Sequence, residues 1–463
     1  KSTTNEAALP DILETLFNGL DPIYEFHCKF MKEIETRLTS WEGRVNPLQK
    51  GNFQRVGDIM LKNVQHLKLY QGYIAKLQSI LQELETGTKK NKKFEVFYKD
   101  FELQKVCYLP FNTFLVKPMQ RLLHYQLILE RLIKHYPSDH HDYKDCKAAL
   151  SEVNELTGIV TDNLKTIQNY QKLTELQRDL VGFDSLLLPG RHFIREGCLH
   201  KLSRKGYQQR MFFLFSDILV YTSKGVTPTN QFKVHGQIPL KGVVLEDSDH
   251  NRSVANCVTL YGTNKTVVIA ASTPEEKERW MADLRTAMAL ASNNPNSPES
   301  NSTMSDPESS VHEESEDDVS SPTRSIERQS HHRANTTVHV CWHRNTSVSM
   351  ADHVRAMENQ LSGFLLRKFK NSNGWQKLWV VFTNFCLFFY KIHQDDYPLA
   401  SLPLLGYSIM FPTEEDDIRK DYVFKLQFKT HVYFFRAESE YTFSRWLEVL
   451  KSATYSSKVE DLF

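Results

Sequence analysis

Apolar residues recur three and four positions apart from about residue 7 to residue 184, a spacing that places side chains on one face of a helix. Glycine and proline are sparse there and interrupt the pattern at Gly87, Pro137 and Gly158. The clearest run of repeating apolar positions is Ile59, Leu61, Val64, Leu67, Leu69, Ile74, Leu77, Ile80 and Leu84. The pattern predicts a bundle of long helices.

The segment 115–135 is predicted to be a helix with two chemically different faces. Its apolar face consists of Leu115, Met119, Leu122, Leu129 and Ile133, with Gln126 as the exception. The opposite face is almost purely basic and consists of Lys117, Arg121, His124, Arg131 and His135, with Ile128 as the exception. Pro118 is expected near the helix start, where proline is tolerated. Two interpretations remain open, an ordinary packed helix and a docking face for another protein, because a solvated face usually mixes both charge signs.

A different period follows Pro189-Gly190. Residues 211–215 and 218–221 are predicted to form two strands around a tight turn, and residues 258–261 and 266–270 are further strand candidates. Thr273-Pro274-Glu275-Glu276 is predicted to be a capping box with proline at the first helical position. The helix that it begins carries on one face Trp280, Leu284, Ala287 and Met288.

The strand-rich pattern occurs twice. Gly197-Cys-Leu199 is repeated as Gly363-Phe-Leu365, and Trp280 is repeated as Trp446, 83 residues after the glycine in both copies. Residues 379–382 and 385–390 also match the first hairpin. We therefore expect two copies of one small domain, each a curled antiparallel sheet closed at one end by a C-terminal helix.

Residues 292 to about 335 are predicted to be a disordered linker, because apolar residues are nearly absent and the run 313–318 is acidic. Three serines are candidate phosphorylation sites, Ser297 and Ser321 before proline and Ser315 before Glu-Asp-Asp. The more apolar stretch Val338–Trp342 is expected either to add a strand or to pack on a neighbouring domain.

Composition narrows the function classes. A net charge of +1 over 463 residues does not indicate a general nucleic-acid-binding or membrane-coating protein. Seven scattered cysteines without a CxxC pair favour reduced thiols in the cytosol over a disulfide framework. No apolar run is long enough to span a bilayer, and no signal peptide is visible. No cofactor or metal is expected, since Asp139-His-His-Asp142 and His331-His332 lack zinc spacing and no phosphate loop or catalytic set stands out.

The repeated domain resembles the pleckstrin-homology (PH) fold, in which Gly-x-Leu opens the first strand and a tryptophan lies in the closing helix. The helical region resembles the Dbl-homology domain of Rho guanine-nucleotide exchange factors through Lys117-Pro-Met-Gln-Arg121, Tyr125 and Gln171-Lys-Leu173. The domain order, with residues 101–108 and 375–390, narrows the resemblance to the FERM, RhoGEF and pleckstrin domain-containing (FARP) family. It implies a multidomain chain, an all-α bundle followed by two small β-barrel or sandwich domains, with expected boundaries 1–187, 188–291, 292–357 (linker), 358–456 and 457–463 (tail).

This resemblance implies that the protein promotes GDP release from a Rho-family GTPase of the Rac, Rho or Cdc42 type without covalent chemistry. Differential binding of the nucleotide-free GTPase would lower the barrier to release. The residues implied in GTPase binding are Lys117, Gln120, Arg121, His124 and, on the last long helix, Thr161 or Asn163. Lys117 would contact the switch regions directly. Of Gln120 and Arg121, one role is expected to be GTPase contact and the other helix–helix packing.

Two further expectations concern activity. The family pattern begins with a helix that carries a glutamate in a Glu-Arg-Thr-Tyr-like context, which is not found here, and residues 1–17 resemble the connection that follows it. This raises the alternative of a membrane-proximal adaptor that docks a GTPase or other proteins without exchange. The tandem PH-like domains are also expected to fold over the basic helix and inhibit exchange, so that deletion of residues 292–463 would raise it.

The PH-like domains suggest a lipid site. The basic candidates are Lys201, Arg204, Lys205 and Arg210 in the first copy and Arg367, Lys368, Lys370 and Lys377 in the second. The headgroup pattern needs a basic-x-Arg pair on the second strand, and the copies read Gln208-x-Arg210 and Gln376-x-Leu378 instead. We therefore expect weak contact with anionic lipids, receptor or scaffold docking, and a cytoplasmic protein recruited to the inner face of the plasma membrane.

Overall fold

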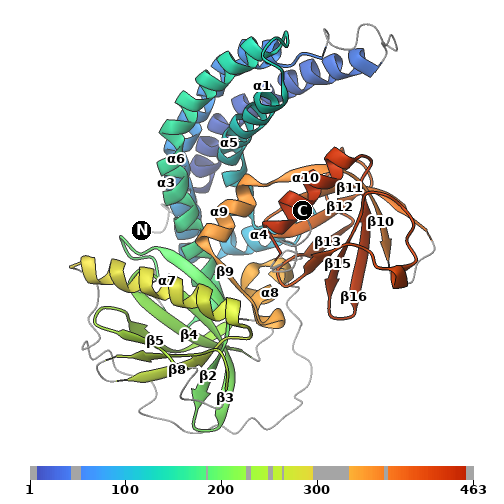
Figure 1. The fold of residues 1–463 in the computed structure, drawn as a ribbon. Coiled ribbons are helices and arrows are strands. Elements are labelled where there is room, and N and C mark those ends of the chain that lie inside the picture. The colour runs from blue at the N-terminus through green and yellow to red at the C-terminus, as the bar shows by residue number, and fades with distance from the viewer. Residues whose placement is uncertain are drawn as a thin grey trace. The chain divides into compact units, whose positions relative to one another are not determined.

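The computed structural model describes residues 8–42, 54–183, 186–225, 231–248, 254–262, 265–295, 333–369 and 374–454 (Figure 1). The chain divides into two compact units. The first, here called the helical unit, comprises residues 1–102 and 109–171. The second, here called the tandem unit, comprises residues 103–108 and 172–463.

The helical unit is the predicted bundle of long helices. Its elements are α1 (Ala8–Glu42), α2 (Gly57–Asn63), the 3-10 turn η2 (Val64–Lys68), α3 (Leu69–Lys90), α4 (Lys92–Glu102), α5 (Phe111–His135) and α6 (Tyr143–Asp179), the last of which continues into the tandem unit. The interpretation of residues 1–17 as a connection is wrong for residues 8–17, which form the first turns of α1. Apolar side chains of α1 and α3, among them Leu16 and Leu77, are buried between the helices.

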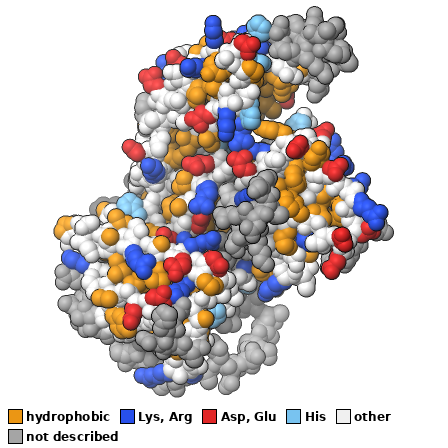
Figure 2. Space-filling model, in the orientation of Figure 1, with side chains coloured by type: hydrophobic (Ala, Val, Ile, Leu, Met, Phe, Trp, Pro, Cys, Tyr) orange, Lys and Arg blue, Asp and Glu red, His pale blue; other side chains and the backbone are white. Residues whose placement is uncertain are grey.

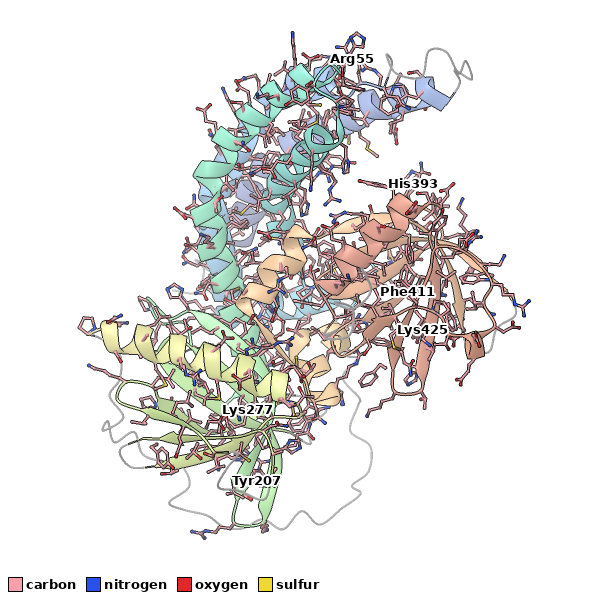
Figure 3. The ribbon with its side chains drawn as sticks, viewed as in Figure 1. Arg55, Tyr207, Lys277, His393, Phe411 and Lys425 are labelled. Carbon is pink, nitrogen blue, oxygen red and sulfur yellow. The ribbon has the colours of Figure 1, made fainter. Side chains whose placement is uncertain are left out.

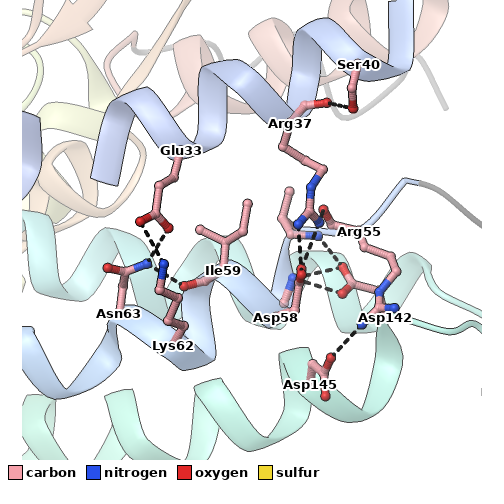
Figure 4. Close-up of polar contacts among 12 residues, drawn as sticks. Glu33, Arg37, Ser40, Arg55, Asp58, Ile59, Lys62, Asn63, Asp142 and Asp145 are labelled. Carbon is pink, nitrogen blue, oxygen red and sulfur yellow. Dashed lines mark hydrogen bonds and ion pairs between the residues drawn. The ribbon is translucent and has the colours of Figure 1, made fainter. Parts of the chain in front are cut away.

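Polar contacts join α1, α2 and the start of α6 (Figure 4). The Arg37 guanidinium donates to both carboxylate oxygens of Asp58, at 2.9 and 2.8 Å. Asp142 is fully buried and accepts the backbone N–H groups of Val56 and Gly57 at 2.8 and 2.9 Å. These N–H groups lie at the start of α2, where no helical partner exists for them. Asp142 belongs to the motif 139–142, which lacks zinc spacing. Its role in the fold is to hold α2 against the start of α6.

The first sheet of the tandem unit is a curled antiparallel sheet with one closing helix. Its strands follow the order β5-β4-β3-β2-β8-β7-β6, and the short β1 (Leu180–Val181) pairs in parallel with β5. The bounds are β2 (Phe193–Ser203), β3 (Gly206–Phe215), β4 (Ile218–Lys224), β5 (Phe232–Pro239), β6 (Val244–Asp247), β7 (Cys257–Tyr261), β8 (Thr266–Ala270) and α7 (Pro274–Asn293). Thr273 caps α7 through the N–H of Glu276, with Pro274 as the first helical residue, as predicted.

The second sheet repeats this topology, which confirms the predicted duplication. Its order is β13-β12-β11-β10-β16-β15-β14. The bounds are β10 (Leu361–Phe369), β11 (Gln376–Thr383), β12 (Cys386–Tyr390), β13 (Ala400–Pro403), β14 (Ser408–Met410), β15 (Val423–Phe428), β16 (His431–Arg436) and α10 (Glu440–Lys451), with the 3-10 turn η6 (Glu414–Asp416) between β14 and β15. Trp280 and Trp446 are both buried in the closing helices, as their equivalent positions predict.

The described part of the segment between the two sheets begins at residue 333. It forms η5 (Arg333–Asn335), α8 (Thr337–Arg344), β9 (Ser347–Ser349) and α9 (Met350–Glu358). A strand at Val338–Trp342 is therefore wrong, because this stretch is helical, whereas its packing on a neighbouring domain is confirmed. The acidic run and the three candidate serines lie outside the described residues.

Burial on both faces explains the continuous apolar run of β3. Phe212 and Leu214 point to the core beneath α7, together with Trp280. Met211, Phe213 and Phe215 belong to a second core, which includes residues of α6, α8, β9 and the second sheet. A strand with one solvent-exposed face would alternate apolar and polar residues instead. The tandem unit therefore has its two sheets joined through the segment 333–358.

The strand β9 extends the first sheet by pairing with β2, where Gly197 lies opposite Ser347. A Cβ atom on residue 197 would lie 2.7 Å from the Ser347 Cα, whereas a Cβ on the equivalent Gly363 would meet nothing closer than Trp446 Nε1 at 3.9 Å. We expect Gly197→Ala to destabilise the tandem unit by about 1–3 kcal/mol through overpacking, and Gly363→Ala to have less effect. Urea unfolding followed by tryptophan fluorescence measures both, and equal losses would contradict the role of β9.

Candidate functional site

Helix α5 carries the predicted two-faced segment. Leu115, Met119, Leu122 and Leu129 are buried, which confirms most of the predicted apolar face. The helix begins at Phe111 after Pro110, which has an extended backbone. Pro118 is therefore not in the first turn as expected but inside the helix, where its ring leaves one backbone hydrogen bond unmade. The helix is maintained there by the burial of its apolar face.

The basic positions of α5 are not equally accessible. Arg121 is exposed, whereas Lys117 and His124 are half-buried. Burial lowers the pKa of Lys117 from 10.5 to about 7. Gln120 is only 9% exposed, which favours a helix–helix role for its side chain over contact with another protein. The described side chains thus leave Lys117, Arg121 and His124 as the reachable residues of the predicted set on α5.

A contact network of aromatic side chains holds Arg121 in place. Its guanidinium lies 4.5 Å from the centroid of the Tyr125 ring, and the Tyr125 hydroxyl is 3.2 Å from His27 Nδ1 on α1. His27 Nε2 is in turn 2.5 Å from the hydroxyl of Tyr70 on α3. Burial, with a contribution from the charge of Arg121, lowers the pKa of His27 to about 4, so this ring is neutral at pH 7. A neutral ring next to Arg121 avoids repulsion and ties the basic face to two other helices.

Sequence reasoning missed His27 and Tyr70. Neither lies in a recognisable motif, and they come 98 and 55 positions before Tyr125, their neighbour in this network. Tyr125 itself belongs to the recognised helix, and its burial beside a histidine could not be read from local spacing. Only the packing of α1 and α3 against α5 brings these side chains together.

Thr161 and Asn163 lie on α6, the last long helix, as expected. Gln171 Nε2 of α6 donates to Thr113 Oγ1 of α5 at 2.8 Å, so the end of α6 meets the start of α5. Asn163 is exposed, whereas Thr161 is half-buried and its hydroxyl donates to the Thr157 carbonyl at 2.8 Å. Asn163 is therefore the more accessible of the two alternatives.

The basic candidates of the first PH-like sheet are largely engaged within the sheet. Lys201 Nζ lies 5.0 Å from the centroid of the Tyr221 ring. The Arg210 guanidinium donates to the Gln208 side chain at 2.6 Å and to the Gln209 carbonyl at 2.9 Å. Arg204 and Lys205, in the turn between β2 and β3, are exposed. Of the four candidates in this sheet, the exposed pair in this turn is the one that a lipid headgroup reaches without displacing such contacts.

The second sheet repeats this picture. The Arg367 guanidinium lies between the rings of Phe369 and Phe389, at 4.7 and 4.6 Å from their centroids, and burial lowers its pKa. Lys377 Nζ lies 4.7 Å from the Phe364 ring, and Lys368 is half-buried on β10. Lys370 lies outside the described residues. Cations held over aromatic rings favour a structural role for this set.

Charged side chains of both signs are spread over the face of the molecule drawn in Figure 2, as the small net charge implies. Among the residues that the structure describes, no helix is long and apolar enough to cross a membrane. Nor do three or more metal-binding side chains gather into a metal site in those same ranges.

Comparison with protein families gives matches to two domain types. The RhoGEF domain matches residues 2–160, which include the basic face of α5. The PH domain matches twice, at residues 193–289 and 359–455, which correspond to the two sheets and their closing helices.

Curated relatives share this combination. The FERM, ARHGEF and pleckstrin domain-containing protein 2 of Homo sapiens is 58% identical over 98% of this chain and 44% of that protein. Protein 1 of the same name from Gallus gallus is 57% identical with the same coverage. The FYVE, RhoGEF and PH domain-containing protein 6 of Homo sapiens is 26% identical over 96% of this chain and 36% of that protein. The chain thus spans less than half the length of these relatives.

Solved structures with similarity include the DH domain of FARP2, at 51% identity and a TM-score of 0.35, over 36% of this chain and 78% of that one. Another is the DH/PH domain of human ARHGEF11 in a ternary complex with human RhoA and its inhibitor. It is 21% identical, with a TM-score of 0.34, and the match covers 60% of this chain and 83% of that one.

Proposed function

Because this chain belongs to the family of proteins that join a RhoGEF domain to PH domains, we propose that it is an exchange factor for a Rho-family GTPase. It promotes GDP release by binding the nucleotide-free GTPase more tightly than the nucleotide-bound form. The proposal needs no covalent chemistry, since the differential binding energy alone lowers the barrier to release.

The basic face of α5 is the observation that carries this proposal. Lys117, Arg121 and His124 lie within eight consecutive residues inside the RhoGEF match. The Tyr125–His27–Tyr70 network holds Arg121, so little side-chain entropy is lost when it meets an acidic surface. Asn163, exposed on α6, carries an amide that can donate to or accept from a partner protein.

Release of a fluorescent GDP analogue from purified Rac-, Rho- and Cdc42-type GTPases tests the proposal. We expect the chain to accelerate release from at least one GTPase and to bind its nucleotide-free form more tightly than its GDP form. Equal binding to both forms with no acceleration would support the alternative, an adaptor that docks a GTPase without exchange. No binding to any of the three would argue against both functions.

We further propose that the PH domains restrain exchange. The loop 103–108, between α4 and α5, belongs to the tandem unit. The Tyr108 ring packs on Phe388 and Tyr390 of β12, at centroid distances of 4.9 and 6.2 Å, and Lys105 Nζ lies 5.5 Å from the Tyr397 ring. Because Phe111 begins α5 three residues after Tyr108, a loop held by the second PH domain restricts the helix that carries the basic face.

Loss of the Tyr108 ring should release this restraint. We expect Tyr108→Ala to raise the rate of GDP release about 5-fold or more, the size of a typical coupling between sites. Tyr441→Ala, which removes an exposed ring from α10 of the same PH domain, is the matched control and should leave the rate unchanged. An unchanged rate in Tyr108→Ala would show that this loop does not mediate inhibition. Deletion of residues 292–463 is a less clean test, because it also removes α8 and β9 from the first sheet.

Weak membrane contact through the exposed Arg204-Lys205 turn fits the PH domains as well. Sedimentation with phosphatidylserine vesicles, with and without Lys205→Glu, tests it. No vesicle-dependent sedimentation, or equal sedimentation of Lys205→Glu, would favour protein docking as the role of these domains.

A further inference from the structure

Four large apolar side chains form an exposed row along α1. Phe17, Tyr24, Met31 and Leu38 are each seven residues apart and are 48%, 67%, 53% and 42% exposed. Seven residues make about two helical turns, so the four side chains follow one line. Exposed apolar residues scattered singly need no explanation, but a continuous line over four heptads does.

A second row runs beside the first. Leu13, Leu20, His27, Ile34 and Trp41 are also seven residues apart, and all five are half-buried. The two rows alternate at spacings of three and four residues, the pattern of the a and d positions of a coiled coil. The positions that α1 buries in the bundle form a different set, which includes Ile12, Leu16, Ile23, Phe26 and Phe30. Helix α1 therefore buries one apolar face in the bundle and leaves the row Phe17, Tyr24, Met31 and Leu38 exposed, with the half-buried second row at the border between them.

The outer edge of this seam is acidic. Glu14, Asp21 and Glu35 occupy the e positions next to the exposed row, and all three are exposed. Exposed Glu25 lies beyond them, with Lys32 as the basic exception in that outer line. The other edge of the seam faces the bundle core. A helix bound to the seam would therefore have carboxylates along its solvent-exposed edge.

This charge pattern distinguishes between occupants. A second copy of α1 would place one acidic edge against another in an antiparallel pair, which is repulsive. A helix with lysine or arginine beside its apolar row would pair with the same carboxylates. The seam, residues 13–41, is about 42 Å long, enough for an extended helix-in-groove contact.

We propose that α1 docks an amphipathic helix of a partner protein, one that carries basic residues on the flank of its apolar heptad row. The proposal does not depend on exchange activity, since the exposed row does not include the basic positions of α5. His27 is the polar member of the second row and already contacts Tyr70 and Tyr125. The apolar members therefore supply the seam.

Cys28 provides a site-specific readout. It lies at the remaining e position between Tyr24 and Met31 and is exposed, whereas the other six cysteines are buried. An environment-sensitive thiol dye on Cys28 is titrated with a synthetic 28-residue helical peptide that has leucine at a and d and lysine at e and g. We expect a blue shift and an affinity at least about 10-fold higher than that of the matched peptide with glutamate at e and g.

Point variants separate the seam from general attraction of a basic peptide. Tyr24→Glu combined with Met31→Glu should lower the affinity for the lysine peptide at least about 10-fold. Phe97→Glu, which alters an equally exposed ring on α4, should leave it unchanged. Equal loss in both variants, or no preference for the lysine peptide, would overturn the proposal. Self-association of the chain that Tyr24→Glu/Met31→Glu abolishes would also overturn it, in favour of a second copy.

Discussion

Replacing Lys117 by glutamate is expected to lower the rate of GDP release that the chain stimulates from its GTPase at least about 30-fold, equivalent to about 2 kcal/mol, as for other partly buried charges at interfaces. Lys117 lies half-buried on the face of α5 that we propose to meet the GTPase. Glutamate there would place a negative charge against the acidic groups of the switch surface. The nucleotide-free complex depends on this contact. The substitution should therefore destabilise that complex more than it slows the initial association of the two proteins.

The comparison variants distinguish contact from folding. Lys134→Glu makes the same charge change at an exposed position in the last turn of α5, outside the proposed contact, and should leave the rate unchanged. Lys117→Met keeps the apolar stem and should keep the helical circular dichroism signal while still reducing the rate. A normal rate in Lys117→Met would mean that the charge of Lys117 does not contribute to exchange.

The pKa of Lys117 adds a pH test of the same contact. With its pKa lowered to about 7 by burial, this side chain is roughly half neutral at pH 7. A carboxylate on the GTPase would favour the charged form, so binding takes up a proton. The affinity for nucleotide-free GTPase should therefore fall as the pH rises from 6 to 8, and Lys117→Met should show a smaller fall. An identical pH dependence in the two proteins would contradict protonation at this site.

Replacing Lys172 by methionine is expected to destabilise the tandem unit by about 3–5 kcal/mol, the cost of leaving a buried charge unpaired. Lys172 Nζ lies 2.8 Å from Glu196 Oε1 and donates to Thr337 Oγ1 at 3.2 Å. The Thr337 hydroxyl also donates to Glu196, which is fully buried. Burial alone would lower the pKa of Lys172, but the charges of Glu175 and Glu196 hold it above its ordinary value, so the lysine stays charged.

A second buried lysine, Lys277, serves as a control for how burial of the acidic partner affects the free energy of unfolding. Lys277, on α7 (Figure 3), is as buried as Lys172. The side chain of its partner Asp247, at 2.7 Å, is 42% exposed. Lys277→Met should therefore cost less, about 1 kcal/mol for the lost pair, because water solvates the remaining carboxylate. The double variant Lys172→Met/Glu196→Leu should recover most of the loss, since no unpaired charge remains.

Urea unfolding followed by tryptophan fluorescence reports these changes, because five of the six tryptophans lie after residue 172. Equal losses in Lys172→Met and Lys277→Met would show that the buried pair has no special role. A double variant as unstable as Lys172→Met would point to packing of the lysine stem instead of its charge.

Local patterns were sufficient for the architecture. The three- and four-residue spacing predicted the helical bundle, and the repeated glycine and tryptophan positions predicted two similar sheets, each closed by a helix. Such patterns record which side chains are buried within one element or one small domain. They failed at Val338–Trp342, where alternating residues form a helix, because the burial of Val338, Val340 and Cys341 against neighbouring elements outweighs strand propensity.

The sequence by itself thus established the family resemblance, the domain order and a basic face on residues 115–135, since each depends on spacing along the chain. Only the tertiary structure decided which of those basic residues are reachable, because the burial of Gln120 and the support of Arg121 depend on other helices. The same holds for Lys172, Glu196 and Thr337, which come from three distant segments and meet only in the folded core. The heptad rows of α1 are legible in the sequence, but packing alone shows which apolar face of that helix the bundle leaves exposed.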